Sequence, residues 1–171
     1  FDVLTFTGTG ASQTIKGLDF QPDLIWCKNR STTDEHLVFD AIRGVEKYIY
    51  PSIPNAEGTA SNTLTAFNSD GFTMAGSDGT NKDGSAIVTW NWDAGTSAAS
   101  VNTDGDIDPT HSWVNTAAGF NIIRYQGNGS NSTVGHNLGA KPHFRITKWY
   151  SNSTAGNENW NVYHHSIGAG S

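Results

Sequence analysis

The chain contains two copies of one sequence unit. Three pairs of segments align in the same order: Phe1–Gly10 with Phe120–Gly129, Gly17–Lys28 with Asn137–Lys148, and Val38–Gly44 with Val162–Gly168. The first pair aligns without a gap, apolar on apolar and glycine on glycine, and Pro22 falls on Pro142 after one inserted residue. Tandem copies of one unit are typical of arrays, stalks and multivalent binders more than of enzymes.

The second copy is shorter than the first. We therefore divide the chain into a first repeat at residues 1–95, a connecting segment at 96–119 and a partial second repeat at 120–171. Because the first residue is Phe and the second copy stops partway through the unit, we expect the chain to be a piece of a longer polypeptide. Half of a sandwich with open strand edges is prone to aggregation, so we expect neighbouring protein to complete it.

Strand patterns separated by turns dominate the chain. Runs that alternate or are compactly apolar are 3–7, 23–28, 36–39, 47–50, 64–67, 72–74 and 86–92. Gly-containing turns such as 68–71 and 82–84 separate some of them. About eight short strands at roughly ten-residue spacing predict an all-β, antiparallel β-sandwich of the jelly-roll or lectin-like kind. Only 40–47 is expected to form a short helical turn.

The apolar members of these strands are the expected core. We predict that one contiguous core between two sheets contains Leu4, Phe6, Leu24, Trp26, Val38, Phe67, Phe72, Val88 and Trp90. Trp92 is also expected to be buried, because aromatic side chains contribute much area to a small sandwich. Cys27 is the single cysteine and lies in an apolar run, which predicts a buried structural thiol.

Composition excludes several classes of partner. The 16 acidic residues outnumber the 10 basic ones, which argues against nucleic acid or an anionic membrane as the partner. No apolar run approaches the roughly 18 residues that span a bilayer, and no basic and apolar leader is visible. We expect no membrane insertion.

The connecting segment is rich in Ser, Thr, Asn and Asp. Val101–Ile107 has the pattern of a hairpin around Asp104-Gly105, against the alternative of an unstructured spacer. Trp113 and Val114 follow and are expected to pair with a neighbouring sheet. If the hairpin forms, it holds the two copies at a fixed angle.

The chain resembles a repeat module of tailed bacteriophages, especially marine and cyanobacterial ones. The segments that carry the resemblance are 6–10, 17–26, 38–44, 67–72 and 88–92 in the first copy, and 120–129 and 134–142 in the second. In that family the unit recurs in tail-fibre and other virion-surface proteins. The resemblance therefore implies a structural part of a virion that attaches to a receptor, and it brings no catalytic residues.

Metal and cofactor chemistry find little support in the sequence. His164 and His165, with Asp40 at the equivalent place in the first copy, come nearest to a cluster. Adjacent strand residues point to opposite faces, so this pair is not expected to bind one ion. Asp104–Asp108 alternates acids as a calcium loop does but lacks its distal Glu, and we interpret it as a turn whose Asp side chains cap amides. No metal and no cofactor are expected, and Asp40 and Arg43 are expected to form an ion pair.

Aromatic residues among polar neighbours are the best functional candidates. Trp113, Trp149, Tyr150 and Trp160 lie in such surroundings, and Trp149 and Tyr150 adjoin Ser151–Gly156, an insertion relative to the first copy. Loops on a rigid scaffold commonly carry binding residues. We predict these four as carbohydrate-binding residues, with packing against a neighbouring subunit as the alternative.

Three functional classes remain. The leading interpretation is a non-enzymatic virion protein at the extracellular virion surface, a tail fibre, spike or surface decoration with host glycans as candidate ligands. An extracellular adhesin or filament subunit of a bacterial cell is the alternative. A glycanase ranks last, since no pair of carboxylates at a catalytic separation is evident.

The missing half of the second copy predicts a partner. With few strands to cover them, Ile122, Tyr125, Phe144, Ile146 and Val162 would face water. At roughly 25 cal/mol per Å² of apolar surface, several such side chains amount to a few kcal/mol. We expect them to be covered by the segment 95–113 or by another chain, in a homo-oligomer or with other virion proteins.

Overall fold

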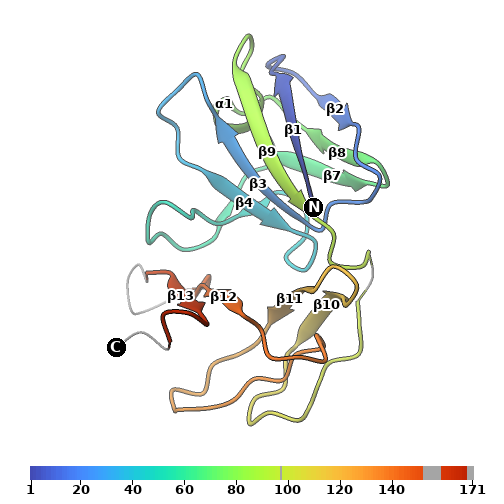
Figure 1. Ribbon diagram of the computed structural model, residues 1–171. Helices are drawn as coiled ribbons and strands as arrows, with labels where there is room; N and C mark the ends of the chain where they lie inside the picture. Colours follow the sequence, from blue (N-terminus) through green and yellow to red (C-terminus); the bar gives the residue numbers. More distant parts are fainter. Residues whose placement is uncertain (97, 152–158, 169–171) are drawn as a thin grey trace.

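The protein is almost entirely β-structure (Figure 1). The computed structural model describes residues 1–96, 98–151 and 159–168. Its elements are β1 (Asp2–Thr7), β2 (Gln13–Lys16), β3 (Leu24–Asn29), β4 (Leu37–Asp40), β5 (Lys47–Tyr48), β6 (Gly58–Thr59), β7 (Leu64–Asn68), β8 (Gly71–Met74), α1 (Asp78–Asn81), β9 (Ala86–Trp92), β10 (His111–Asn115), β11 (Phe120–Arg124), β12 (Phe144–Thr147) and β13 (Asn161–His164). The expected all-β class is confirmed. Among the described residues, no helix is long and apolar enough to cross a membrane.

Residues 1–95 form a two-layer antiparallel sandwich. One layer is a four-stranded sheet in the order β1-β9-β3-β4, and the other is a three-stranded sheet in the order β2-β8-β7. Figure 1 shows the first sheet in front of the second, and β5 and β6 pair as a separate short ribbon. β9 lies between β1 and β3, so the first and last strands of this unit are hydrogen-bonded neighbours in one sheet.

The core lies between these two sheets. The four-stranded sheet contributes Ile25, Cys27, Leu37, Phe39 and Ile87, and the opposite sheet contributes Ile15, Leu64, Phe72 and Met74. Leu4, Phe6 and Phe67 pack against this cluster, so they and Phe72 were predicted correctly. The rings of Phe6 and Phe72 meet edge to face across the layers, with centroids 6.3 Å apart.

Of the other core candidates, Val38 and Val88 are buried as predicted, whereas Leu24, Trp26 and Trp90 are only half-buried, and none of the five belongs to the cluster between the two sheets. Cross-strand pairing places Trp26 opposite both Trp90 and Val38, and Leu24 opposite Trp92. Successive side chains of a strand point to opposite faces, and the neighbours of these residues, such as Ile25 and Ile87, fill the core. These candidates therefore lie on the other face of the four-stranded sheet, together with Trp92: Leu24, Trp26, Val38, Val88 and Trp90.

The second unit consists of two hairpins. β10 pairs with β11, and β12 pairs with β13, each as a two-stranded sheet. The β12–β13 hairpin has the register of β3–β4 under the sequence alignment: Ile146 faces Val162 as Trp26 faces Val38. The chain after each hairpin also turns alike, since the amide of Ala41 donates to the Asp23 carbonyl, and the amide of His165 donates to the His143 carbonyl, both at 2.8 Å.

A glycine ends both of these turns. Gly44 has φ 87° and the aligned Gly168 has φ 74°. No atom lies within 4 Å of the Cβ that a side chain would add at either position. The backbone angle, which only glycine adopts readily, is therefore what the turn requires.

Two local predictions are corrected. Val101–Ile107 is not a hairpin: Ile107 bridges Val134 in parallel, and the Asp106 carboxylate accepts hydrogen bonds from the amide and hydroxyl of Thr133, both at 2.8 Å. A partner distant in sequence thus replaces the local one. Trp113 and Val114 do pair with a neighbouring strand, β11. Residues 41–43 form a hydrogen-bonded turn, and the short helix is α1 instead.

Buried polar groups tie the first unit together. Asp23 is fully buried, and its Oδ2 accepts hydrogen bonds from the amides of Ala94 and Thr96 at 2.8 and 3.1 Å. Arg43 and Asp40 form the expected ion pair at 2.5 Å, with Glu57 at 3.4 Å from the same guanidinium. Both partners of the ion pair are buried, so removing either one would leave an uncompensated charge in the interior.

Candidate functional site

Three contacts join the end of the second unit to the 50–57 loop of the first. The indole Nε1 of Trp160 donates to the Tyr50 carbonyl at 2.7 Å, and the Lys148 ammonium donates to the Pro54 carbonyl at 2.9 Å. The Glu57 amide donates to the Tyr150 carbonyl at 2.8 Å. Three separate hydrogen bonds join the two segments here, and the one from Nε1 orients the Trp160 ring.

A hollow of about 330 Å³ lies beside Trp160. Its lining is Pro51, Ser52, Ile53, Pro54, Asn159 and Trp160. Proline restricts φ, so the loop that forms one wall has few alternative conformations. The hollow combines an indole and proline rings with the Asn159 amide, and we refer to it as the Trp160 hollow. Residues 152–158, which include most of the predicted insertion loop, lie outside the described residues.

The four predicted aromatic residues occupy different surroundings. Trp149 is 53% exposed, whereas Trp160 borders the hollow. The Tyr150 ring lies 5.3 Å from the Arg124 guanidinium, a cation–π contact. Trp113 lies in β10 opposite Ile122, so it forms part of a sheet surface. The structure thus brings Tyr150 and Trp160 to the junction with the first unit.

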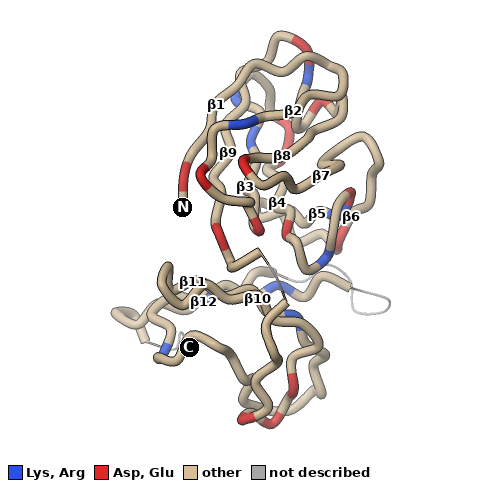
Figure 2. The backbone as a smooth tube through the Cα atoms, turned by 90° about the vertical axis from the view of Figure 1, so that its right-hand side faces the viewer, with Lys and Arg blue, Asp and Glu red and all other residues tan. Residues whose placement is uncertain are grey.

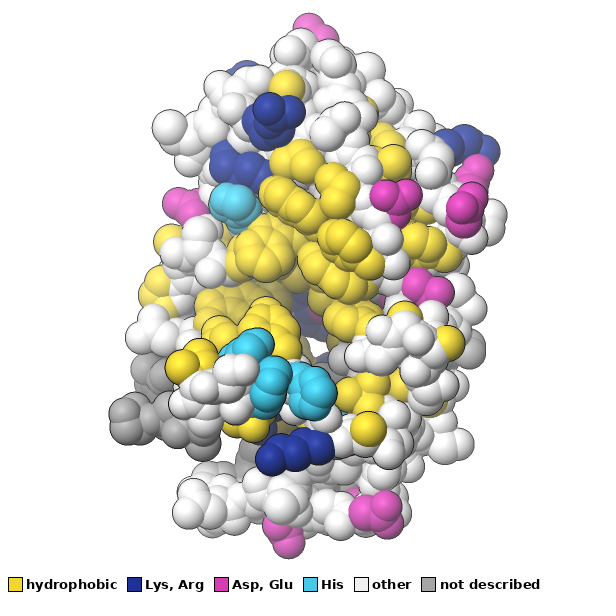
Figure 3. All heavy atoms as spheres, in the orientation of Figure 1, with side chains coloured by type: hydrophobic (Ala, Val, Ile, Leu, Met, Phe, Trp, Pro, Cys, Tyr) yellow, Lys and Arg dark blue, Asp and Glu magenta, His cyan; other side chains and the backbone are white. Residues whose placement is uncertain are grey.

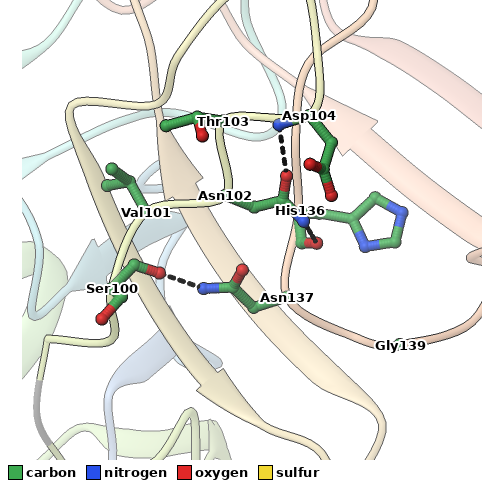
Figure 4. Close-up of a pocket in the computed structure, with 8 residues that line it drawn as sticks. All are labelled: Ser100, Val101, Asn102, Thr103, Asp104, His136, Asn137 and Gly139. Carbon is green, nitrogen blue, oxygen red and sulfur yellow. Dashed lines mark hydrogen bonds between the residues drawn. The ribbon is translucent and has the colours of Figure 1, made fainter.

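Sequence reasoning missed a second, polar hollow. It measures about 550 Å³ and is lined by Ser100, Val101, Asn102, Thr103, Asp104, His136, Asn137 and Gly139 (Figure 4). Asn102 donates to the His136 carbonyl at 3.0 Å, and its own Oδ1 accepts from the Asp104 amide at 2.8 Å. Asn137 donates to the Ser100 carbonyl. These side-chain amides hold the loop of residues 100–104 against the loop of residues 136–139. No local pattern in either loop predicts this pairing.

Glycine and a carboxylate hold the same two loops in place. A Cβ on Gly135 would lie 2.1 Å from the Asn102 carbonyl oxygen, so only glycine permits this approach. The hydrogen bonds from Thr133, first from its amide and then from its hydroxyl, lower the pKa of Asp106. Asp106 therefore caps an amide, which is the role that the turn interpretation assigned to acids of this segment.

Three histidines of the second unit, His143, His164 and His165, gather at the base of the β12–β13 hairpin. The ring centroids of His143 and His165 are 4.5 Å apart, and those of His164 and His165 are 4.7 Å apart. Asp40, which aligns with His164 in the first copy, forms an ion pair with Arg43. Among the described residues no three His, Cys, Asp or Glu side chains are grouped to hold a metal ion.

Burial determines the protonation of Cys27, the single cysteine of the chain. Cys27 points into the core, and desolvation raises its pKa to about 12, against a weaker opposing effect of Lys28. A thiol in this environment stays protonated and unreactive. This agrees with the structural role predicted for it.

Comparison with known proteins places the chain in one family. No curated protein and no solved structure matches the chain. The model of a family described as a domain of unknown function, DUF7483, matches residues 1–171. The chain therefore belongs to the DUF7483 family.

Proposed function

We propose that this protein is a non-enzymatic structural component of a bacteriophage virion, a tail fibre, spike or surface decoration, that binds host surface glycans. The Trp160 hollow carries the glycan part of the proposal. A sugar ring offers apolar C–H faces together with hydroxyl groups at its rim. The hollow offers a complementary set: an indole, two prolines and the side chains of Ser52 and Asn159.

The position of Trp160 supports this choice. Its Nε1 is held by the Tyr50 carbonyl, so the ring loses little freedom when a ligand binds. The prolines of the opposite wall are equally restricted. A preorganised aromatic edge is a better platform for a weakly bound sugar than a freely rotating side chain.

The tandem arrangement supports the structural part. The β3–β4 and β12–β13 hairpins have the same register although they come from different stretches of the chain. Repeated modules present several binding sites at once, and linked sites raise avidity without new contacts. Such multivalency suits attachment to a dense, repetitive polysaccharide surface.

A polysaccharide-binding assay tests the glycan part. The probes are immobilised bacterial lipopolysaccharides and capsular polysaccharides, with binding measured by biolayer interferometry. For the probe that binds, we expect Asn159→Ala and Trp160→Phe to weaken binding by at least about tenfold, because each removes a group of the hollow. Asn128→Ala is the matched control, since Asn128 is exposed and bonds locally to Ser132. Equal loss in the control, or no binding to any probe, would contradict the proposal.

Immunogold labelling tests the structural part. Antibodies against the chain are expected to label phage particles in lysates of infected cells. Label confined to the envelope or filaments of uninfected bacterial cells would favour the adhesin alternative. The two assays are independent, because an adhesin would also retain the polysaccharide binding.

A further inference from the structure

The polar hollow between residues 100–104 and 136–139 is a second candidate binding site. Asn102 joins its two walls, because the side-chain amide donates to the His136 carbonyl and accepts from the Asp104 amide. Both polar atoms of Asn102 are thus engaged within the protein. The groups that can meet a ligand are therefore found among the other lining residues.

Close backbone contacts fix the shape of this hollow. A Cβ on Gly105 would lie 2.7 Å from the Gly135 amide nitrogen, and a Cβ on Gly135 would lie 2.1 Å from the Asn102 carbonyl oxygen. Only glycine permits either approach. The Ile107 amide also donates to the Thr133 carbonyl at 3.0 Å. The hollow is therefore formed before a ligand arrives, which reduces the entropy that binding costs.

Asp104 supplies an acceptor to the hollow. It is exposed, and within the described residues its carboxylate has no hydrogen-bond or ion-pair partner. Figure 4 shows this carboxylate and the His136 ring extending to the same side of Asn102. A carboxylate accepts hydrogen bonds from two hydroxyl groups at once, and bonds to a charged acceptor are stronger than those between neutral groups.

His136 supplies a donor to the same hollow. The Leu138 amide donates to His136 Nδ1 at 3.3 Å, so the hydrogen of the neutral ring is on Nε2. In the part of the chain that the structure describes, this Nε2 has no acceptor. The hollow therefore presents one donor and one charged acceptor to a ligand.

Val101 adds an apolar patch to this polar lining. It is 38% exposed, whereas Ser100, Asn102 and Thr103 beside it are polar. A sugar ring has the matching surface, because it combines a C–H face with hydroxyl groups at its rim. The lining therefore fits a saccharide better than a ligand that is apolar throughout.

Apolar surface gathers elsewhere on the molecule. Figure 3 shows hydrophobic side chains over β1, β3 and β9 and again toward the β12–β13 hairpin. In that hairpin Phe144, Ile146 and Val162 are 55%, 44% and 58% exposed, and the segment 95–113, which was expected to cover them, contributes β10 residues that pair with β11 instead. The polar hollow lies outside both apolar regions, since none of its lining residues belongs to those strands.

Charge disfavours an acidic ligand. Asp104, Asp106 and Asp108 alternate along one wall, and the described lining contains neither Lys nor Arg. Figure 2 shows the acidic residues of the second unit gathered at its lower end. A phosphate or a uronate would be repelled there. A metal ion alone is not favoured either, because among the described residues no three His, Cys, Asp or Glu side chains are grouped to hold one.

We propose that the polar hollow binds a neutral sugar residue through its hydroxyl groups. Two adjacent hydroxyls donate to the Asp104 carboxylate, His136 Nε2 donates to a ring oxygen, and the C–H face rests on Val101. The volume of about 550 Å³ falls within the roughly 300–1,000 Å³ of small-molecule sites. The inference goes beyond the glycan binding proposed above, because it adds a second site in which no residue of the Trp160 hollow takes part.

An NMR titration of the full chain with single sugars locates the site. The probes are the methyl glycosides of glucose, galactose, mannose and N-acetylglucosamine, added at millimolar concentrations to isotope-labelled protein. For at least one probe we expect saturable shifts of the Asn102 and Asp104 amides and of the His136 ring. The absence of saturable shifts at these groups with all of the probes would overturn the proposal.

Asp104→Asn tests the carboxylate. It removes the charge and keeps the shape, and we expect the dissociation constant of the bound sugar to rise by at least about tenfold, because hydrogen bonds to a charged acceptor are lost. Asp108→Asn is the matched control, since Asp108 is also exposed in this segment and lies outside the lining. Equal weakening by the control would overturn the proposal.

Two further arms separate this site from the Trp160 hollow and from a cation site. Trp160→Phe should leave the Asp104 shifts unchanged, and the proposal then stands even if the Trp160 hollow binds no glycan. Sugar-induced shifts confined to the Trp160 indole and residues 50–54 would overturn this proposal and leave the glycan site proposed above intact. Calcium chloride without sugar should not shift the Asp104 amide, and a saturable shift would assign the hollow to a cation and overturn the proposal.

Discussion

The β3–β4 and β12–β13 hairpins, which align in sequence, differ in burial although they share a register. In β3–β4 the residues Ile25 and Phe39 are fully buried, whereas the aligned Arg145 and Tyr163 in β12–β13 are not. Both hairpins pair residue for residue in the same way and end in a glycine turn. Pairing and turn are local properties that the two aligned segments share. Burial depends on whether a second sheet is present.

A matched pair of substitutions gives the largest difference between the hairpins. We expect Phe39→Ala to lower the free energy of unfolding by about 3–5 kcal/mol, because it empties a fully buried site in the core. Tyr163→Ala at the aligned position should cost less than about 1 kcal/mol, because its site is partly exposed. Urea unfolding followed by tryptophan fluorescence measures both. Equal costs would mean that the second hairpin has a core of its own.

Much of this fold was predictable from sequence, and the limits have a physical cause. The alignment anticipated the shared register, since Pro22, Gly44 and their counterparts fix where strands begin and turns end. The buried face of β3 was assigned wrongly because Leu24–Cys27 is apolar on both faces, so alternation cannot show which side is inward. Other pairings, such as that of Ile107 with Val134, join residues distant in sequence and leave no local pattern.

The candidate functional residues also divide into those that a local pattern indicates and those that depend on distant segments. The sequence singled out Trp160, which lies beside the Trp160 hollow, because an aromatic among polar neighbours is a local signal. The polar hollow was missed because it requires residues 100–104 to meet 136–139. Asn102 and Asn137 hold those loops, and an asparagine in a polar segment does not identify its partner. The strands β2 and β6 were missed because they contain few apolar residues.

The ion pair after β4 offers a second matched comparison. Arg43 is buried with Asp40, whereas the aligned Ile167 is 79% exposed. We expect Arg43→Ala to cost about 3 kcal/mol, because it leaves the buried Asp40 carboxylate uncompensated. Ile167→Ala should change stability by less than about 0.5 kcal/mol.

A double-mutant cycle separates this pairing from simple packing. Asp40→Asn in the Arg43→Ala background should restore part of the loss, because the unpaired charge is gone. Thermal unfolding of the four proteins at one pH gives the coupling. Additive effects of the two substitutions would show that Arg43 acts through its alkyl chain alone.

Asp23 and its counterpart His143 sharpen the comparison at the start of each hairpin. Asp23 accepts from the amides of Ala94 and Thr96, which fastens the chain after β9 to β3. We expect Asp23→Ala to cost about 1–3 kcal/mol, because it leaves the amide of the buried Ala94 without its acceptor. His143→Ala should have a smaller effect. Hydrogen exchange by NMR checks the mechanism: the Ala94 and Thr96 amides should lose protection, and unchanged protection would contradict it.

The smallest expected effect concerns pH and again separates the two units. Trp26 donates from its indole Nε1 to His36 Nδ1 at 2.9 Å, so the imidazole must be neutral to accept. Burial, followed by the charge of Lys28, lowers the pKa of His36 below its usual 6.5. The residue that aligns with His36 is Trp160, which cannot titrate, so this position of the second hairpin contributes no such dependence.

The sign of the effect follows from linkage between protonation and folding. Because the folded pKa is the lower one, the unfolded chain binds the proton more readily, and stability falls as the pH drops from about 6.5 through the folded pKa. The exposure of His36 to solvent keeps the effect small. We expect His36→Gln to lose less stability than the unaltered chain between about pH 7.5 and pH 5, since glutamine does not titrate there. Urea unfolding at the two pH values measures this, and an NMR titration that places His36 at or above 6.5 would contradict it.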